Sequence, residues 1–393
     1  MDDVVILSAV RTPIGTFQGA LSGLPAHALG ARAIAAAIER AGLTPEEIQQ
    51  VNMGCVLTAG QGQAPARQAA LGAGCPVATG AITLNKVCGS GMRAVMIAAN
   101  DLRCGDFKYV VAGGMESMSQ APYLAPGARD GLRLGHGKFL DSMIHDGLWD
   151  PYGDLHMGNC AESCATEYKF SREDQDAYAQ ESYRRAREAT EKGLFAEEIV
   201  PVQIPQKKGD PKAVDRDEEP FKSDLSRMGS LKPAFQKDGT VTAANASKIN
   251  DGAAALVLTT ASEAARRGVR PLARVIAHSS LAQEPQKFTT APGGAVRGGL
   301  ERAGLKAADI DLWEVNEAFA VVAMAFLRDL EVPADRLNVR GGAVALGHPI
   351  GASGARILVT LLHSLRERGG RLGCAAICIG GGEATAMIVE RID

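Results

Sequence analysis

The chain has 393 residues, a formal net charge of −3 at pH 7 and 46% hydrophobic residues. It is too long for one typical hydrophobic core, so two or three folding units are expected. The near-neutral charge contains no long block of one sign and gives no electrostatic reason to expect a nucleic-acid partner, and no apolar run reaches the roughly 18 residues of a membrane helix.

The ends of the chain and its cysteines indicate a reducing, cytoplasmic location. The sequence opens directly on a strand-like run without the basic and apolar regions of a signal peptide. Eight cysteines are sparse for a disulfide framework in so long a chain. The Cys160/Cys164 and Cys374/Cys378 pairs are spaced more widely than zinc-binding pairs and have no accompanying histidine pair, so no metal site is predicted.

The first part of the chain alternates between strand and helix patterns. In chain order we expect a strand over 4–10, a helix over 29–41, a strand over 51–56, a helix over 91–103 and a strand over 109–112. Short apolar runs between helical patterns are typical of largely parallel sheets with helices on their faces.

Residues 119–249 differ in composition, being rich in Gly, Pro and charged residues. They contain one long polar helix from Ser171 to about Lys192, with Ser171 and Asp174 as a capping pair. Either a solvated insertion without chemistry or a substrate-binding lobe fits this segment. The apolar run 251–258 that follows returns to strand character and is expected to rejoin the first sheet.

The last part of the chain repeats the order of the first. We expect strands over 273–278, 312–315 and 374–379, with helices over 295–303 and 353–368. Two sequence matches support a duplication, because they occur at nearly the same offset. Glu39-Arg40-Ala41-Gly42-Leu43 recurs as Glu301-Arg302-Ala303-Gly304-Leu305, and Ser90-Gly91-Met92-Arg93 recurs as Ser353-Gly354-Ala355-Arg356. The predicted units are therefore 1–118 completed by 250–270, an insertion over 119–249, and 271–393.

Cys88 is the first candidate for chemistry. It lies where a strand-like run over 81–87 meets the helix that starts near Gly91, and the positive end of a helix favours the thiolate. The neighbouring glycines leave room for a substrate. A thiolate at this point could carry an acyl group as a thioester. The alternative is a buried structural cysteine.

His348 and Cys378 lie in two further glycine-rich stretches. Pro349 biases His348 toward an extended or turn conformation, from which its ring could take the proton of Cys88. Cys378 ends an apolar strand and precedes three glycines, whose N–H groups could stabilise an oxyanion. Asn316 and Glu317 also follow a predicted strand: Asn316 could orient a water or a carbonyl, and Glu317 could fix His348 or a nearby backbone group. Structural roles are the alternative for each.

One motif is typical of a different class of protein. Gly89-Ser90-Gly91-Met92-Arg93-Ala94 fits the G-x-G-x-x-A pattern of dinucleotide-binding proteins. However, it follows the third strand of its half, stands directly after a cysteine, and lacks the acidic residue that the pattern requires downstream. These departures argue against a nucleotide-dependent oxidoreductase.

Taken together, the stretches around Cys88, His348 and Cys378, with Asn316-Glu317-Ala318-Phe319, resemble the thiolase family, the acyl-CoA C-acetyltransferases, and the resemblance spans essentially the whole chain. It implies an α/β fold of two duplicated βαβαβ halves, packed as α-β-α-β-α layers, with an inserted loop domain. That domain would hold coenzyme A and help to build a homotetramer.

The resemblance also implies a ping-pong reaction on coenzyme A thioesters, in fatty acid metabolism including β-oxidation, without a permanently bound cofactor. By analogy, Cys88 carries the acyl group, His348 activates it, and Cys378 moves the proton of the attacking acetyl group or of the CoA thiol. One oxyanion hole would consist of His348 and a water held by Asn316, the other of the backbone N–H groups of Cys88 and Gly380. Residues expected to contact acyl-CoA are His156, Met157, Phe235, Ala243, Ser247, Phe288 and Phe319.

Three positions depart from the pattern of acetoacetyl-forming relatives. Lys248 stands where they often have Gly, Arg340 where they commonly have Asn, and Phe288-Thr289 where many have Met-Gly. Two other functions remain as alternatives: a decarboxylating condensing enzyme of the ketoacyl synthase kind, and a catalytically silent CoA- or lipid-binding member of the fold. The first would use two histidines, or histidine and asparagine, beside its cysteine; the second would lack at least one reactive residue.

Overall fold

The computed structural model describes residues 2–392. The N-terminal half contains β1 (Val4–Arg11), α1 (Ala26–Arg40), β3 (Gln50–Gly54), α2 (Pro65–Gly72), β4 (Gly80–Leu84), α3 (Ser90–Cys104), β5 (Val110–Ser117) and β12 (Asn250–Thr260). The C-terminal half contains β13 (Ala273–Ala282), α8 (Ala291–Ala303), β14 (Leu312–Val315), α9 (Ala320–Leu330), α10 (Ala343–Leu346), α11 (Ile350–Arg368), β15 (Leu372–Ile379) and β16 (Glu383–Arg391).

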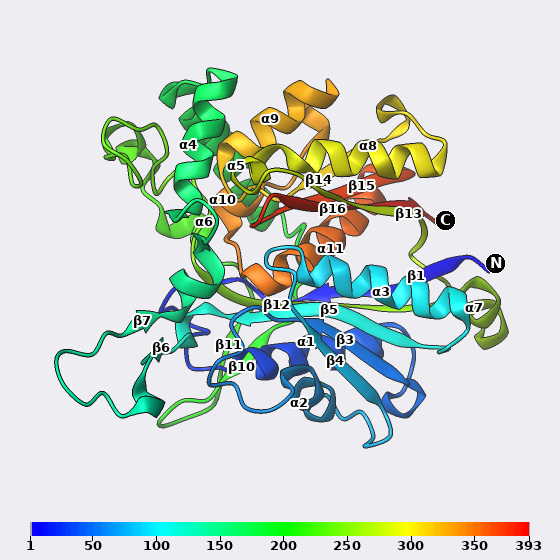
Figure 1. Ribbon diagram of the computed structural model, residues 1–393. Helices are drawn as coiled ribbons and strands as arrows, with labels where there is room; N and C mark the ends of the chain where they lie inside the picture. The colour runs from blue at the N-terminus through cyan, green and yellow to red at the C-terminus, as the bar shows by residue number, and fades with distance from the viewer. Residues whose placement is uncertain (1, 393) are drawn as a thin grey trace.

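The two halves form five layers, as predicted (Figure 1). Helices α1 and α2 cover the outer face of the N-terminal sheet, and α8 and α9 cover the outer face of the C-terminal sheet. The layer between the sheets consists of α3 and α11, which pack against each other and against strands of both sheets. The helices after the two Ser-Gly repeats therefore meet at the centre of the molecule.

The prediction of largely parallel sheets is wrong. The strand order is β14-β15-β16-β13-β1-β12-β5-β3-β4, and only the pairs β14–β15, β3–β4 and β3–β5 are parallel. Strand β16, which the sequence analysis did not predict, follows β15 through a tight turn in which Gly381 and Gly382 have positive φ, so it runs back antiparallel. Strand β12 returns from the loop domain and pairs antiparallel with both β1 and β5.

Most predicted boundaries of helices and strands agree with the structure to within a few residues. Two strand ends differ, one because glycines allow close packing and the other because the chain turns. The strand expected over 109–112 continues to Ser117 as β5, because Gly113 and Gly114 let the backbones of β12 and α11 approach it closely. The strand expected over 81–87 ends at Leu84, because residues 85–89 turn back before α3.

Two glycines bring the central helices into backbone contact. A Cβ on Gly91 would lie 2.8 Å from the amide nitrogen of Ala355, and a Cβ on Gly354 would lie 2.5 Å from that of Met92. Gly91 and Gly354 occupy equivalent places in the sequence repeat. Since Cys88 precedes α3 and His348 precedes α11, this contact places the two reactive residues at the same end of the central layer.

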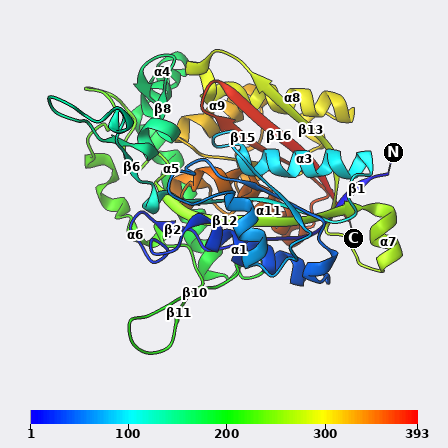
Figure 2. The same ribbon diagram turned by 60° about the horizontal axis from the view of Figure 1, so that its bottom comes forward.

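The loop domain caps one end of this layered body (Figures 1 and 2). Its elements include β6 (Tyr123–Leu124), β7 (Leu140–Asp141), α4 (Met157–Tyr168), α5 (Arg172–Glu191), β10 (Val202–Ile204), β11 (Lys212–Val214) and α6 (Glu219–Lys222). The predicted capping pair is present: Ser171 Oγ accepts the Asp174 N–H at 3.0 Å, and Asp174 accepts the Ser171 N–H at 2.9 Å. Within residues 2–392, no helix has the length and apolarity to cross a membrane.

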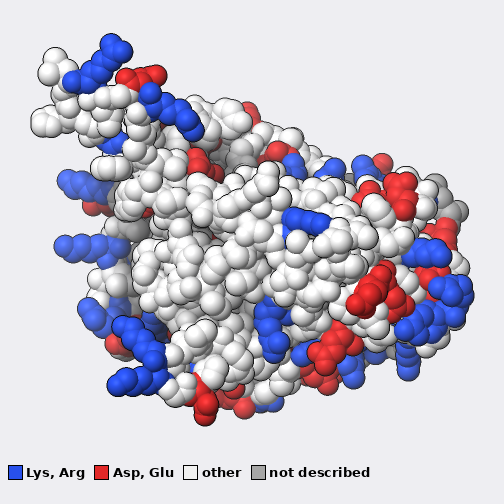
Figure 3. Space-filling view, turned by 90° about the horizontal axis from the view of Figure 1, so that it is seen from below, with Lys and Arg blue, Asp and Glu red and all other residues white. Residues whose placement is uncertain are grey.

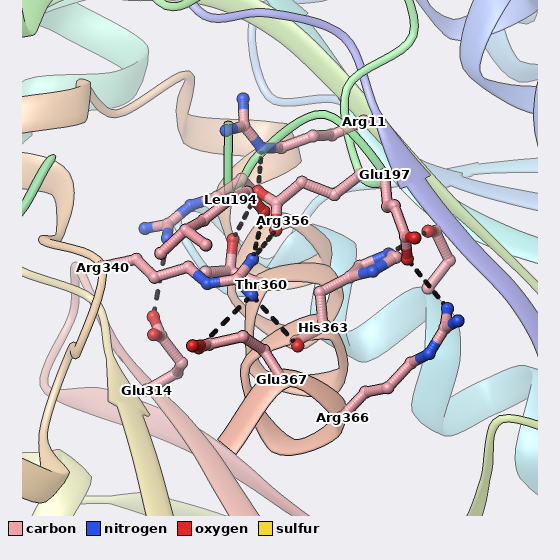
Figure 4. A network of polar contacts seen from close by, with 12 residues as sticks. Arg11, Leu194, Glu197, Glu314, Arg340, Arg356, Thr360, His363, Arg366 and Glu367 are labelled. Atoms are coloured by element: carbon pink, nitrogen blue, oxygen red, sulfur yellow. Dashed lines mark hydrogen bonds and ion pairs between the residues drawn. The ribbon is translucent and has the colours of Figure 1, made fainter. Parts of the chain in front are cut away.

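Buried ion pairs join the loop domain to both halves (Figure 4). Glu198, from the loop domain, accepts from Arg11 Nε of β1 at 2.6 Å, from Arg340 at 3.3 Å and from Thr360 of α11 at 3.1 Å. Arg340 also donates to the backbone carbonyls of Leu194 and His363. The departure at position 340 thus adds a buried cross-link between domains.

Candidate active site

A cavity of about 430 Å³ lies where the loop domain meets the two halves. Its walls contain most of the predicted site residues: Cys88, His348, Gly380, His156, Met157, Phe235, Ala243, Ser247, Phe288 and Phe319. The other two predicted residues, Asn316 and Cys378, do not line it, and both are completely buried. Asn316 contacts the His348 ring, and Cys88 lies near enough to raise the pKa of the Cys378 thiol, so both belong to the same centre.

Cys88 is presented by a strained turn between β4 and α3. Val87 has a φ of +44°, a conformation that β-branched residues rarely adopt. Three hydrogen bonds hold it: Asn85 Oδ1 accepts the Val87 N–H at 2.8 Å, Ser90 Oγ donates to the Val87 carbonyl at 2.6 Å, and Ser90 Oγ accepts the Lys86 N–H at 2.8 Å. The turn leaves Cys88 partly exposed at the cavity wall.

The Cys88 thiol keeps its proton in the free protein, so a base is needed to ionise it, as the sequence analysis expected of His348. Burial raises its pKa to about 11, although its sulfur accepts the backbone N–H groups of Gly380 and of Cys88 itself. The cost of burying a thiolate therefore exceeds the stabilisation that the helix start and these two donors supply. The same two N–H groups point at the reacting sulfur, so they could hold an oxyanion formed there.

His348 is held in one tautomer. The single hydroxyl proton of Ser353 goes to the Pro349 carbonyl at 2.9 Å, so His348 Nδ1–H must be the donor in the 2.6 Å bond to Ser353 Oγ. This leaves a lone pair on Nε2, which lies 3.4 Å from Asn316 Nδ2. Burial, with a smaller contribution from Arg356, lowers the pKa of His348 to about 3. The ring is thus a neutral base.

The backbone of His348 is fixed as firmly as its ring. Asn250 Oδ1 accepts the His348 N–H at 2.9 Å. Gly347 has a φ of +105°, and a Cβ at this position would clash with the Asn250 side chain. Only glycine fits at 347, and Asn250, at the start of β12, supports the catalytic loop directly.

Glu317 does not touch His348. Of its two expected roles, the structure gives it the second, since it accepts the backbone N–H of Val344 in α10 at 3.1 Å. Tyr178 and Ser182 of α5 also donate to its carboxylate, at 2.8 and 2.7 Å. Glu317 therefore fixes the short helix that leads into Gly347 and His348.

Cys378 is buried near the end of β15, two residues before Gly380. Burial, reinforced by the proximity of Cys88, raises the pKa of its thiol well above the usual range. Cys88 and His348 thus lie in the cavity wall and Cys378 is buried close to Cys88, each group starting in its neutral form. This set can take up and release protons around a thioester without a metal ion.

Aromatic rings form the wall expected to contact acyl-CoA. Phe235 stacks on His156 with ring centroids 4.8 Å apart, and its edge meets Phe319 at 6.0 Å. Phe288 packs against Phe319 at 6.4 Å. Gly158 at the start of α4 makes room for Phe235, because a Cβ there would overlap its ring. The rings give a long, thin, apolar ligand a stable surface.

Comparisons with known proteins identify the family of this chain. The family model described as "Thiolase, N-terminal domain" matches residues 4–262, and that described as "Thiolase, C-terminal domain" matches residues 269–391. The chain belongs to the thiolase family.

Relatives of this thiolase match it over its whole length. It is 51% identical to an acetyl-CoA acetyltransferase of Pseudomonas aeruginosa over 100% of both chains, and 52% identical to a mitochondrial acetyl-CoA acetyltransferase of Danio rerio over 100% of this chain and 92% of that protein. Among solved structures, the Ascaris suum Acat5 thiolase in complex with coenzyme A superposes with a TM-score of 0.95 at 44% identity, over 99% of this chain and 100% of that one. The Bacillus anthracis acetyl-CoA acetyltransferase gives 0.97 at 40%, over 100% and 99%.

Several residues of the thiolase site were missed by the sequence analysis. Met118, Leu148 and Ile350 line the cavity; Met118 and Ile350 belong to an apolar cluster against which Leu148 and Cys88 pack. They come from three separate segments, so no sequence pattern connects them. Ser353 could have been found, because it belongs to the Ser-Gly repeat and its counterpart Ser90 braces Cys88.

The described part of this thiolase, residues 2–392, contains no group of three or more His, Cys, Asp or Glu side chains arranged to hold a metal ion. All eight cysteines are free.

Proposed function

We propose that this thiolase is an acetyl-CoA C-acetyltransferase. It condenses two acetyl-CoA molecules to acetoacetyl-CoA and CoA, and in reverse it cleaves 3-ketoacyl-CoA with CoA, as in β-oxidation. The observation that carries the proposal is that Cys88 and His348 line one apolar cavity, with Cys378 buried next to Cys88. The full-length similarity to named acetyl-CoA acetyltransferases supports it.

In the first half-reaction, His348 Nε2 takes the Cys88 proton as the sulfur attacks the carbonyl of acetyl-CoA. The N–H groups of Cys88 and Gly380, which already point at this sulfur, hold the oxyanion. The C–S bond to CoA then breaks, and the CoA sulfur leaves with the proton of Cys378. The products are acetyl-Cys88, an imidazolium and a Cys378 thiolate.

In the second half-reaction, the Cys378 thiolate removes a proton from the methyl group of another acetyl-CoA. His348 and a water held by the free Oδ1 of Asn316 hydrogen-bond the enolate oxygen. The enolate carbon attacks acetyl-Cys88, the C–S bond to Cys88 breaks, and acetoacetyl-CoA leaves. Cys88 recovers its proton from His348, so every group returns to its starting form.

Cys378 also separates this function from the two alternatives. A decarboxylating ketoacyl synthase would place a second histidine or an asparagine where this chain buries a thiol. A silent binding protein would have no reason to keep Cys88, His348 and Cys378 together with the Ser353 bond that sets the tautomer of His348.

The proposal extends to assembly and location. Figure 3 shows one face of the molecule with few charges at its centre. Strand β4 lies at the edge of the sheet, where it pairs with β3, and it exposes Ile82; Val77, just before this strand, is also exposed. The β6–β7 arm exposes Leu134 and Phe139. We assign these two surfaces to the contacts of a homotetramer, and the free cysteines fit the cytoplasm. Light scattering should give a tetramer mass that falls in Leu134→Asp.

The first test is intact-mass spectrometry after brief exposure to acetyl-CoA. Acetylation should map to Cys88 and be absent in Cys88→Ala, whereas Cys104→Ala, which removes an exposed cysteine, should behave as wild type. Cys378→Ala should still be acetylated slowly but should not condense. Acetylation at another residue, or normal condensation by Cys378→Ala, would contradict these roles. Relative turnover of acetoacetyl-CoA and a longer 3-ketoacyl-CoA gives the chain-length range.

A further inference from the structure

Lys248 extends its ammonium group into the junction between the substrate wall and the catalytic loop. It lines the same cavity as Cys88 and His348. Its Nζ donates to the backbone carbonyl of Ala246 at 2.9 Å and to that of Val344 at 2.9 Å. The ring of Tyr183 lies below it, with its centroid 5.2 Å from Nζ. Two carbonyls and an aromatic face thus surround one positive charge.

The two carbonyls belong to segments that do different things. Ala246 directly precedes Ser247, which lines the cavity in the wall expected to contact pantetheine. Val344 lies in α10, four residues before His348, and its N–H is already held by Glu317 at 3.1 Å. Both backbone polar groups of Val344 are therefore held, the N–H by an anion and the C=O by a cation.

Without the ammonium, this junction would be unfavourable. Two carbonyl oxygens that each lie 2.9 Å from one nitrogen point at the same small region and repel each other unless a donor lies between them. Val344 itself is completely buried, so water cannot reach its peptide freely. A charged donor that satisfies both carbonyls holds α10 at a fixed distance from the substrate wall.

The neighbouring charges fit this role. Glu219 and Glu317 both favour the charged form of Lys248, while burial lowers its pKa to about 8, so the ammonium predominates at neutral pH. Glu219 accepts from Asn250 at 3.3 Å, and Asn250 in turn accepts the His348 N–H. The lysine and its counter-ion thus brace the His348 loop at two points, α10 and the His348 backbone.

We propose that Lys248 is a positioning residue of this enzyme, whose ammonium ties the substrate-binding wall at Ala246 to the α10 segment and so keeps His348 Nε2 aligned with Cys88. The inference rests on the proposed function for its kinetic part, but the alignment of His348 and Cys88 can be measured without turnover.

The experiment compares Lys248→Met, which keeps the length and loses charge and donors, with Lys248→Ala and with Lys207→Met, an exposed lysine of the β10–β11 hairpin, as the control. The first readout is the rate of Cys88 alkylation by iodoacetamide at pH 7, followed by intact mass. The second is kcat and KM for thiolysis of acetoacetyl-CoA. Turnover by the wild-type enzyme tests the proposed function. The ratio of each rate in the variant to that in wild type tests the positioning role of Lys248.

We expect kcat to fall roughly 10- to 100-fold in Lys248→Met, the range for losing charge-assisted hydrogen bonds, with a smaller change in KM. Cys88 alkylation should slow about as much, since the base is displaced. Ethylammonium should restore part of both rates in Lys248→Ala, whereas tetramethylammonium, which has charge but no N–H, should not. Lys207→Met should match wild type.

If Lys248→Met had the same Cys88 alkylation rate and the same kcat as wild type, the proposal would be overturned. So would a loss in Lys248→Ala that ethylammonium does not relieve, because a packing role would give that result. If Lys248→Met does not fold, the effect of ethylammonium on the rates of Lys248→Ala tests the proposal instead. If wild type lacks thiolase turnover, the alkylation rates still test Lys248 while the proposed function fails.

Discussion

At the scale of single residues, the site keeps its nucleophile and its base neutral until substrate is present. Burial sets the pKa of Cys88 at about 11 and that of His348 at about 3, so neither thiolate nor imidazolium forms at pH 7 in the free protein. A thioester carbonyl in the cavity changes this balance, because the negative charge moves onto an oxygen held by two N–H groups. The reactive ion pair thus depends on bound substrate.

A first prediction concerns the pH dependence of Cys88 alkylation in the free enzyme. At pH 7 the alkylation rate includes proton transfer from Cys88 to His348. Since the thiolate fraction grows with pH below the pKa, the rate with iodoacetamide should then rise with pH and approach a tenfold increase per pH unit up to about pH 10. Intact-mass kinetics, with Cys88→Ala subtracted for the other cysteines, measures it. A plateau reached below pH 8 would show that the thiolate already exists in the free enzyme.

A second prediction concerns Ser353, which accepts from His348 Nδ1 at 2.6 Å. Ser353→Ala removes the acceptor that selects the tautomer, so kcat should fall roughly 10- to 100-fold with little change in KM. Ser364→Ala on the same helix is the matched control: its hydroxyl is buried without a hydrogen-bond partner, so its removal should leave kcat unchanged. Equal kcat values for the two variants would exclude the assigned role.

At the scale of elements, the crossing of α3 and α11 decides where the chemistry occurs. Neither helix carries both reactive residues; each contributes one at its start, and Gly91 and Gly354 let the backbones touch there. The repeat in the sequence had predicted these helices, and α11 begins at Ile350 instead of 353. What the repeat could not reveal is that the two glycines face each other, since that is a property of the packed pair.

The corresponding prediction is that Gly354→Ala destabilises the protein by about 1–3 kcal/mol, the range for overpacking a core, because the new Cβ would lie 2.5 Å from the Met92 nitrogen. Chemical denaturation measures the change. Gly298→Ala in α8 is the control, since its nearest neighbour would lie at 3.8 Å; there the better helix propensity of alanine should add about 0.5–1 kcal/mol. If Gly354→Ala stabilised the protein, or if Gly298→Ala destabilised it as much as Gly354→Ala, the close contact between α3 and α11 would be contradicted.

At the scale of the whole molecule, a buried charge cluster holds three domains together (Figure 4). Glu198 is completely buried, and although burial opposes its ionisation, Arg11, His363 and Arg340 hold its pKa below the usual value. Arg11 is shared with Asp217 of the loop domain, which it contacts with both terminal nitrogens. The loop domain is therefore joined to the layered body by charges that cannot be separated without cost.

Two adjacent glutamates allow a matched test of this cluster. Glu198→Gln leaves buried cations with less compensation and should cost about 3 kcal/mol, at the lower end for breaking a buried pair, because Arg11 keeps Asp217. Glu197→Gln breaks an exposed pair with Arg366 and should cost less than about 1 kcal/mol. Urea unfolding measures both, and a cost for Glu198→Gln no larger than that for Glu197→Gln would rule out a stabilising role.

The sequence by itself determined the family, the duplicated halves, most helices and strands, and the residues that reach the cavity, because short motifs such as the Cys88 and His348 stretches combine a reactive side chain with the glycines that its turn requires. It did not determine strand direction, since β12 and β16 find their antiparallel partners only in the assembled sheets. Nor did it reveal how strongly burial raises the pKa of Cys88, because a helix start is visible in a sequence and burial is not. Tertiary structure alone decided the tautomer of His348, the apolar wall from Met118, Leu148 and Ile350, and the place of Lys248, since each depends on groups distant in the chain that meet only after folding.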